Sequence, residues 1–175
     1  MNRHCQVFAA IAAALLVTSS AAGAQATSGA DDEFNRFFVG TWSCADTVGD
    51  HAGKYTTTIS RTLDDHWLRQ TYAWAPTTEE PKPLGGEYLI SYDPRVRKWI
   101  RMGAMTDGMY FAMTGARRGD TLTYGYVLPS TSGTAVYIRQ SDREYHVRGP
   151  SYPENGKMVT ERHTCRRSSP GQEAP

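Results

Sequence analysis

Two residues near the end of the chain, Glu161 and His163, have side chains that could transfer protons. Residues two apart in an extended strand point to the same face, so this carboxylate and this imidazole would lie side by side. Such a pair could act as acid and base on a bound substrate. A single histidine is more often an ordinary hydrogen-bonded wall residue, so we assign no catalytic residue.

No other motif of the sequence predicts catalysis or metal binding. There is no Gly-x-Ser-x-Gly elbow, no phosphate-binding glycine loop and no dinucleotide fingerprint. His-x-His, His-Glu-x-x-His and Cys-x-x-Cys are also absent, so we expect neither a metal site nor a cofactor. His66 and His146 could join His163 only if their strands lie close together. Arg69 and Arg101 stand in strand-like segments, and either could bind an acidic ligand if it is buried.

The start of the chain has the three parts of a secretory signal peptide: a basic residue at Arg3, an apolar run and small residues before a cleavage site. Two sites compete, and cleavage would follow Ala24 or Ala26. We therefore divide the chain into a signal peptide, residues 1–26, and one mature domain, residues 27–175. The apolar run is shorter than the ~20 residues of a membrane span. We expect a secreted or periplasmic protein with no integral membrane segment.

Two of the three cysteines, Cys44 and Cys165, belong to the mature domain. Cys5 precedes the apolar run and would be removed with the signal peptide. In an oxidising compartment an even pair predicts a disulfide. This bond would close a loop of more than a hundred residues, and the loop-entropy model gives it at most about 4 to 5 kcal/mol of stabilisation.

The charge balance argues against a polyanionic partner. The 19 basic residues, less Arg3, leave 18 against 18 acidic ones. No basic run is longer than a pair, and we interpret pairs such as Arg117-Arg118 and Arg166-Arg167 as solvated turn or tail residues. We therefore expect no nucleic acid partner, and the oligomeric state stays open.

One short helix is expected over residues 31–38, where acidic residues precede aromatic residues at positions 34, 37 and 38. From there on, short segments rich in Thr, Tyr, Val, Ile and Trp alternate with turn residues. The Pro-rich stretch from Pro76 to Pro83 predicts an exposed loop. The segments predict about ten strands, over residues 39–45, 54–62, 66–74, 85–92, 98–104, 109–115, 121–128, 134–140, 143–149 and 157–166.

Short connections favour antiparallel neighbours, so these strands predict a meander. A sheet of this size either splits into two stacked sheets or curls into a barrel, and closure removes its exposed edges. A bond between Cys44 and Cys165 would join the first strand to the last, which favours the barrel. A sandwich with a cross-sheet disulfide is the alternative. The expected fold class is all-β, a single antiparallel meander β-barrel with a short N-terminal helix.

The sequence resembles a known group of proteins at several points. A Gly-x-Trp on the first strand, after a short helix, is similar to the start of lipocalins and of the wider calycin group. The sequence also resembles a family of secreted bacterial lipocalin-like domains of unknown function. The motifs that carry this resemblance are Gly40-Thr41-Trp42, Leu84-Gly85-Gly86-Glu87-Tyr88, Tyr92-Asp93-Pro94 with Trp99, and Asp107-Gly108. The resemblance covers nearly the whole mature chain. It implies a barrel with an internal cavity and no settled activity.

A neighbouring calycin group, the nitrobindins, is similar in having about ten strands and holds haem with a histidine on a late strand. By that resemblance His163 would be the haem ligand. The nitrobindin pattern is Gly-x-Trp-x-Gly-x-Gly, and this chain has Cys44 and Asp46 in place of its second and third glycines. We therefore expect no haem.

Alternation along the strands predicts which side chains face the interior. With Trp42 inward, as the resemblance implies, Cys44 and its partner Cys165 face inward too, followed by His163 and Glu161. The same count gives inner faces made by His66, Leu68, Gln70, Tyr72 and Trp74, by Tyr88, Ile90 and Tyr92, by Met109, Phe111 and Met113, and by Leu122, Tyr124 and Tyr126. The candidate ligand-binding residues are Trp42, Tyr72, Trp74, Tyr88, Phe111, Met113, Tyr124, Tyr126 and His163.

These features predict a secreted barrel that binds a small hydrophobic or amphipathic molecule and catalyses nothing. Two alternatives stay open. One is an enzyme that uses the same cavity, with His163 and Glu161 as acid and base on a small substrate. The other is a structural module of the cell envelope whose barrel interior is filled by its own side chains. Binding requires an open pocket, and catalysis requires an open pocket in which titratable groups converge.

Overall fold

The computed structural model describes residues 29–49, 51–74, 84–129 and 133–168. The predicted signal peptide, with Cys5, and the Pro-rich stretch from Pro76 to Pro83 lie outside these residues. Among the described residues, no helix is both long enough and apolar enough to span a membrane.

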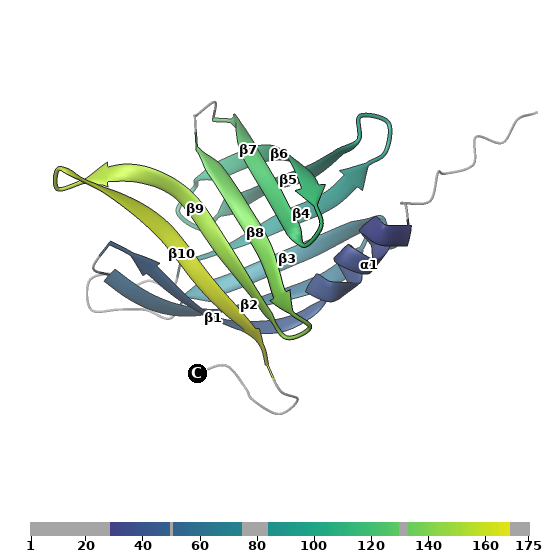
Figure 1. The fold of residues 1–175 in the computed structure, drawn as a ribbon, viewed down its shortest axis with the longest axis horizontal. Coiled ribbons are helices and arrows are strands. Elements are labelled where there is room, and N and C mark those ends of the chain that lie inside the picture. Colours follow the sequence, from purple (N-terminus) through teal and green to yellow (C-terminus); the bar gives the residue numbers. More distant parts are fainter. Residues whose placement is uncertain (1–28, 50, 75–83, 130–132, 169–175) are drawn as a thin grey trace, which may run out of the picture.

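Within the described residues the chain forms one helix and ten strands, which Figure 1 labels. They are α1 (Gly29–Phe38), β1 (Gly40–Val48), β2 (His51–Thr62), β3 (Trp67–Trp74), β4 (Gly85–Asp93), β5 (Lys98–Met105), β6 (Tyr110–Arg118), β7 (Thr121–Leu128), β8 (Thr134–Ser141), β9 (Glu144–Glu154) and β10 (Lys157–Arg167). Each strand pairs with its neighbours in the sequence, antiparallel throughout, and β1 also pairs with β10. The predicted fold class, a closed antiparallel meander barrel, is confirmed, and the sandwich is excluded.

The first and last strands are joined covalently as well as by hydrogen bonds. Cys44 and Cys165 are directly opposite each other on β1 and β10, with their Cα atoms 4.1 Å apart, and they form a disulfide. Both side chains are fully buried on the inner face. The predicted bond is confirmed, and it lies where the barrel closes.

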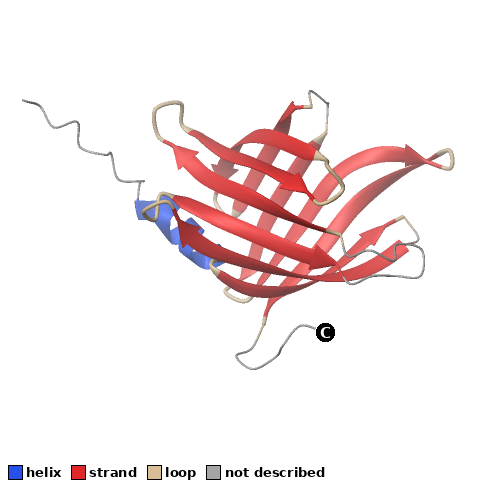
Figure 2. Ribbon diagram, turned by 180° about the vertical axis from the view of Figure 1, so that it is seen from behind, coloured by secondary structure: helices blue, strands red, loops and turns tan. Residues whose placement is uncertain are grey.

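Helix α1 covers one end of the barrel. Its three aromatic residues are buried, with Phe34 against Trp99, and Phe37 and Phe38 against Tyr145. Figures 1 and 2 place this helix at the end of the barrel opposite the tip of the β9–β10 hairpin. The aromatic spacing that predicted the helix is therefore also the surface that closes this end.

The last turn of α1 is held by side chains from β1 and β10. Trp42 Nε1 donates a hydrogen bond of 2.8 Å to the carbonyl of Phe38. Arg167 donates to the carbonyls of Val39 and Phe37, and its guanidinium lies 4.3 Å from the centre of the Trp42 ring. The interpretation of Arg167 as a solvated tail residue is therefore wrong, because a helix end needs donors for its free carbonyls and Arg167 supplies them.

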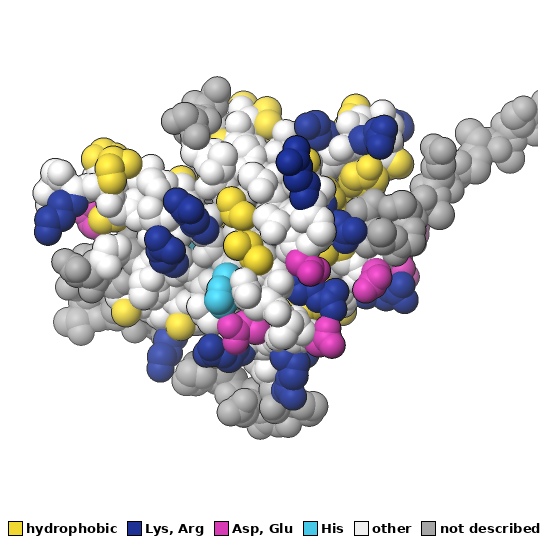
Figure 3. Space-filling view, viewed as in Figure 1, with side chains coloured by type: hydrophobic (Ala, Val, Ile, Leu, Met, Phe, Trp, Pro, Cys, Tyr) yellow, Lys and Arg dark blue, Asp and Glu magenta, His cyan; other side chains and the backbone are white. Residues whose placement is uncertain are grey.

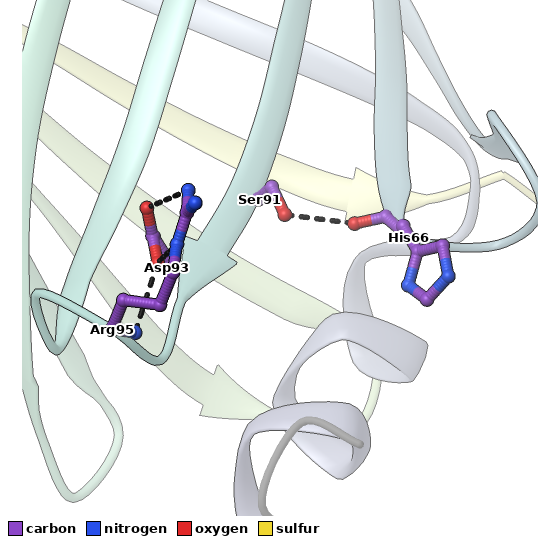
Figure 4. A network of polar contacts seen from close by, with 4 residues as sticks. All are labelled: His66, Ser91, Asp93 and Arg95. Carbon is purple, nitrogen blue, oxygen red and sulfur yellow. Dashed lines mark hydrogen bonds and ion pairs between the residues drawn. The ribbon is translucent and has the colours of Figure 1, made fainter. Parts of the chain in front are cut away.

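Polar contacts close the turns at the same end, as Figure 4 shows. The hydroxyl of Ser91 donates to the carbonyl of His66, and Asp93 accepts three hydrogen bonds from Arg95. These bonds hold the pKa of Asp93 below its ordinary value. His66 lies in the turn before β3 with an exposed side chain, so its predicted place on the inner face is wrong.

Candidate ligand-binding cavity

The barrel encloses a cavity of about 360 Å³ in the half that lies away from α1. Seven of the nine candidate residues line it: Tyr72, Trp74, Tyr88, Phe111, Met113, Tyr126 and His163. The other two, Trp42 and Tyr124, also point inward but lie deeper, in the core next to α1. The resemblance, for Trp42, and alternation, for the other eight, therefore placed all nine on the inner face and did not distinguish the cavity from the core.

Aromatic rings form a continuous wall along one side of the cavity. The rings of Tyr55 and Trp74 are 4.4 Å apart between centroids, and Trp74 contacts Tyr72 at 4.8 Å. Tyr72 stacks on Tyr88 at 5.0 Å, and Tyr88 contacts Phe111 at 4.8 Å. This wall runs over five strands, from β2 to β6. It offers apolar ring faces to whatever enters the cavity.

The floor of the cavity is polar. Gln70, Arg101, Tyr137 and Tyr145 line both the cavity and a void of about 20 Å³ beneath it. Gln70 is fixed by a hydrogen bond of 2.9 Å from its amide nitrogen to the hydroxyl of Thr57. These four residues separate the cavity from the aromatic core under α1.

Arg101 is the most unusual residue of the floor. Its side chain is 5% exposed, and it forms no ion pair with a carboxylate of the described residues. Its guanidinium carbon lies 4.2 Å from the centre of the Tyr88 ring and 5.1 Å from that of Tyr137. Arg69, the other candidate anchor, is exposed and pairs with Glu87 at 2.6 Å, outside the barrel. Of the two arginines that the sequence singled out, only Arg101 reaches the cavity.

Burial raises the pKa of the cavity tyrosines. This holds for Tyr55, Tyr88, Tyr137 and Tyr145, in each of which loss of water around the hydroxyl is the main cause. The nearby positive charge of Arg101 opposes the effect in Tyr88, Tyr137 and Tyr145. At neutral pH these side chains are uncharged phenols. They add hydrogen-bonding groups to the cavity and no negative charge.

His163 and Glu161 do lie side by side on the inner face of β10. Nε2 of His163 is 2.7 Å from Oε1 of Glu161, and Nδ1 is 3.2 Å from the hydroxyl of Tyr55. With the proton on Nε2, the imidazole donates to the carboxylate and accepts from the phenol. The three groups form one hydrogen-bonded chain on the cavity wall. The sequence predicted the first link and missed Tyr55.

The backbone of β9 leaves room for the side chain of Glu161 to bond to His163. Glu161 lies at an irregularity in the pairing of β10 with β9, and its side chain passes over Gly149. A Cβ at residue 149 would come within 2.6 Å of Oε2 of Glu161. A side chain at residue 149 would therefore displace the side chain of Glu161, whose Cβ also lies within 2.9 Å of that position.

His146 does not join this group. It points outward from β9 and bonds to Glu144 at 2.8 Å, while its neighbours Tyr145 and Val147 point inward. Within the described part of the chain, no three His, Cys, Asp or Glu side chains are grouped so that they could hold a metal ion.

Sequence reasoning missed several wall residues, including Tyr55, Met105, Tyr137 and Tyr145. The signal was available for two of them. Tyr55 is opposite Cys44 in the pairing of β1 with β2, and alternation from Trp99 gives Arg101 and then Met105. Tyr137 and Tyr145 required the inner faces of β8 and β9, for which the sequence offered no marker residue.

The cavity reaches the surface at the end away from α1. Met109 and Tyr110 line it and are 56% and 65% exposed. Other exposed apolar residues at this end include Leu128 on β7, and Tyr152 and Met158 on the β9–β10 hairpin. Figure 3 shows hydrophobic side chains gathered at the tip of that hairpin. An apolar ligand would thus meet apolar side chains on its way in.

No family model and no curated protein matches this chain. One solved structure that it resembles is a redesigned β-barrel, with 12% sequence identity and a TM-score of 0.45. The match covers 77% of this chain and 95% of that one. A likeness at this level carries no argument about family or activity. The strand pairing establishes the fold.

Proposed function

We propose that this protein is an exported, lipocalin-like binding protein that holds a small hydrophobic or amphipathic molecule in its barrel. The observation that carries the proposal is the cavity of about 360 Å³, which reaches the surface and has an aromatic wall with a few polar groups. Pockets for small molecules are usually about 300 to 1,000 Å³ in volume, mostly apolar, with a small number of orienting polar groups. The size favours a ligand of a few rings or a short chain.

The cavity also argues against the alternative of a barrel that is filled by its own side chains. The aromatic residues of α1 pack one end and leave a void of only about 20 Å³ there, whereas the other end has a wall of rings facing open space. Large apolar rings around an open cavity lose the packing contacts that a filled interior would provide. A bound molecule would restore those contacts.

Native mass spectrometry of protein purified from its producing cells, without refolding, tests the proposal. We expect an adduct of small-molecule size that is released on denaturation. The same sample tests export, because the intact mass should correspond to cleavage after Ala24 or Ala26. A full-length mass would contradict the export part of the proposal and leave the binding part standing.

A titration with the neutral fluorescent dye N-phenyl-1-naphthylamine tests the cavity directly. The dye should bind the wild-type protein at a single saturable site. Ala135→Phe, which adds a ring inside the cavity, should weaken binding, and Val136→Phe, one residue along on the outer face, should not. If the dye shows no saturable binding, or both variants bind it equally, the cavity is not the binding site.

One observation favours a second candidate, an enzyme. The hydrogen bonds that link Glu161 to His163 and His163 to Tyr55 resemble the arrangement in which a carboxylate orients an imidazole that exchanges a proton with a hydroxyl. If the released adduct is a reaction product, His163→Gln should yield protein that holds the unconverted molecule. The same adduct in both proteins would argue against the enzyme.

A further inference from the structure

We infer that the ligand of this cavity is an organic anion whose acidic group, a carboxylate or a sulfonate, binds Arg101 on the floor while its apolar body lies along the aromatic wall. This inference rests on the proposed function, because it names the chemical class of molecule that the same cavity takes. It adds a specific residue, a charge and an orientation to that proposal.

Arg101 carries a buried positive charge. A guanidinium stays protonated at any physiological pH, and a buried charge is unfavourable unless it is paired. Arg101 is 5% exposed and forms no ion pair with the carboxylates that the structure describes. Its cation–π contacts with Tyr88 and Tyr137 offset part of the lost hydration and bring no negative charge.

The other described groups of the cavity leave this charge uncompensated. The carboxylate of Glu161 is bonded to His163 on β10, on the other side of the barrel from β5. The buried tyrosines around Arg101 have raised pKa values and are uncharged at neutral pH. An anion entering the cavity would therefore be the counter-ion that the described residues do not supply.

The position of Arg101 sets the orientation of the ligand. Arg101 lies at the boundary between the cavity and the core, whereas Phe111 and Met105 lie nearer the mouth. An acid bound at Arg101 would thus have its body between the floor and the mouth, along the rings of Tyr88 and Phe111. The planar guanidinium has five N–H donors and suits a carboxylate or sulfonate with two oxygens side by side.

Two dyes with one ring skeleton test the inference. 8-Anilinonaphthalene-1-sulfonate carries a sulfonate, and N-phenyl-1-naphthylamine is the same skeleton without it. We expect wild-type protein to bind the sulfonate dye more tightly than the neutral one. Arg101→Met removes the charge and keeps most of the side-chain volume. It should weaken binding of the sulfonate dye by about tenfold or more, because charge-assisted hydrogen bonds are lost, and change binding of the neutral dye much less.

Arg69→Met is the matched control. Arg69 is a strand arginine that points outward and pairs with Glu87, so its loss should change neither affinity. If Arg101→Met leaves the ratio of the two affinities as it is in the wild type, the inference is overturned. In that case, retained binding of the neutral dye shows that the cavity proposal survives. If neither dye binds the wild-type protein, the cavity proposal fails and this inference fails with it.

A competition experiment on the wild-type protein needs no variant. 1-Naphthoate and 1-naphthalenemethanol share a flat body and differ in the acidic group. Each should displace the neutral dye, and the carboxylate should do so at the lower concentration. Equal displacement, or better displacement by the alcohol, would overturn the inference whether or not Arg101→Met folds.

Discussion

The ring of Tyr88 lies directly across the backbone of Gly103 on the neighbouring strand. A Cβ at residue 103 would come within 2.1 Å of Cδ1 of Tyr88 and 2.4 Å of the carbonyl oxygen of Glu87. Gly103 therefore allows the ring to lie flat against the barrel wall, where its face meets the guanidinium of Arg101. Gly86 and Gly115 stand in the same relation to Tyr72 and Tyr124.

Gly103→Ala should therefore destabilise the protein and disturb the floor of the cavity. Because the added Cβ clashes with backbone as well as with a ring, we expect a loss of about 1 to 3 kcal/mol in the free energy of unfolding. Urea denaturation measures the loss. Gly125→Ala is the control, since a Cβ there has nothing within 4 Å. Equal stability of the two variants would contradict this account of Tyr88.

Removing the disulfide should lower stability and leave the fold intact. The bond spans 121 residues, for which the loop-entropy model gives at most about 4 to 5 kcal/mol. The hydrogen bonds between β1 and β10 remain in the double variant Cys44→Ala, Cys165→Ala, so its circular dichroism should match the wild type. Its urea midpoint should be lower than that of the oxidised wild type. It should equal the midpoint of wild-type protein that has been reduced under denaturing conditions and refolded. An unchanged midpoint would show that strand pairing alone closes the barrel.

Arg167→Met should show how much the cap at the end of α1 stabilises the fold independently of the disulfide. The variant loses two hydrogen bonds from a charged group to carbonyls at the end of α1, so we expect a loss of about 2 kcal/mol. Arg166→Met is the matched control, because Arg166 is exposed and pairs with Glu144 on the surface. Thermal unfolding of both variants measures the difference. A loss of equal size in Arg166→Met would argue against the cap.

The buried tyrosines predict loss of stability in alkali. Their folded-state pKa values are raised above the ~10 of an unfolded chain, so the folded state keeps protons that the unfolded state releases. The stabilisation is complete below that pH and is lost as the pH rises above it. Phenolate absorbance and circular dichroism should therefore change together in an alkaline titration.

Tyr124→Phe should move this transition to higher pH. The Tyr124 hydroxyl is buried and has no hydrogen-bond partner among the described residues, so its removal takes away a group that ionises on unfolding and breaks no bond. Tyr110→Phe is the control, since Tyr110 is 65% exposed. If the phenols ionise while circular dichroism stays native, the tyrosines are more accessible than the structure indicates.

The sequence by itself determined the strands, their turns and the inward side of most of them. These features are local: the alternation of side chains and the preference of particular residues for positive φ need no knowledge of distant parts of the chain. Leu63, Asp64 and Asp65 all have positive φ in the turn between β2 and β3, and Gly156 has positive φ in the turn between β9 and β10. The cysteine pair added one long-range fact, the meeting of the first and last strands.

The tertiary structure alone decided how far along the barrel each inward side chain lies. Alternation separates inward from outward side chains and does not predict their position along the barrel axis. That position depends on the tilt of the strands and the register between them. Trp42 and Tyr124 therefore belong to the core, whereas Tyr88 and His163 belong to the cavity. The same register buries Arg101 beneath the aromatic wall and leaves Arg69, on the outer face of β3, in an exposed ion pair.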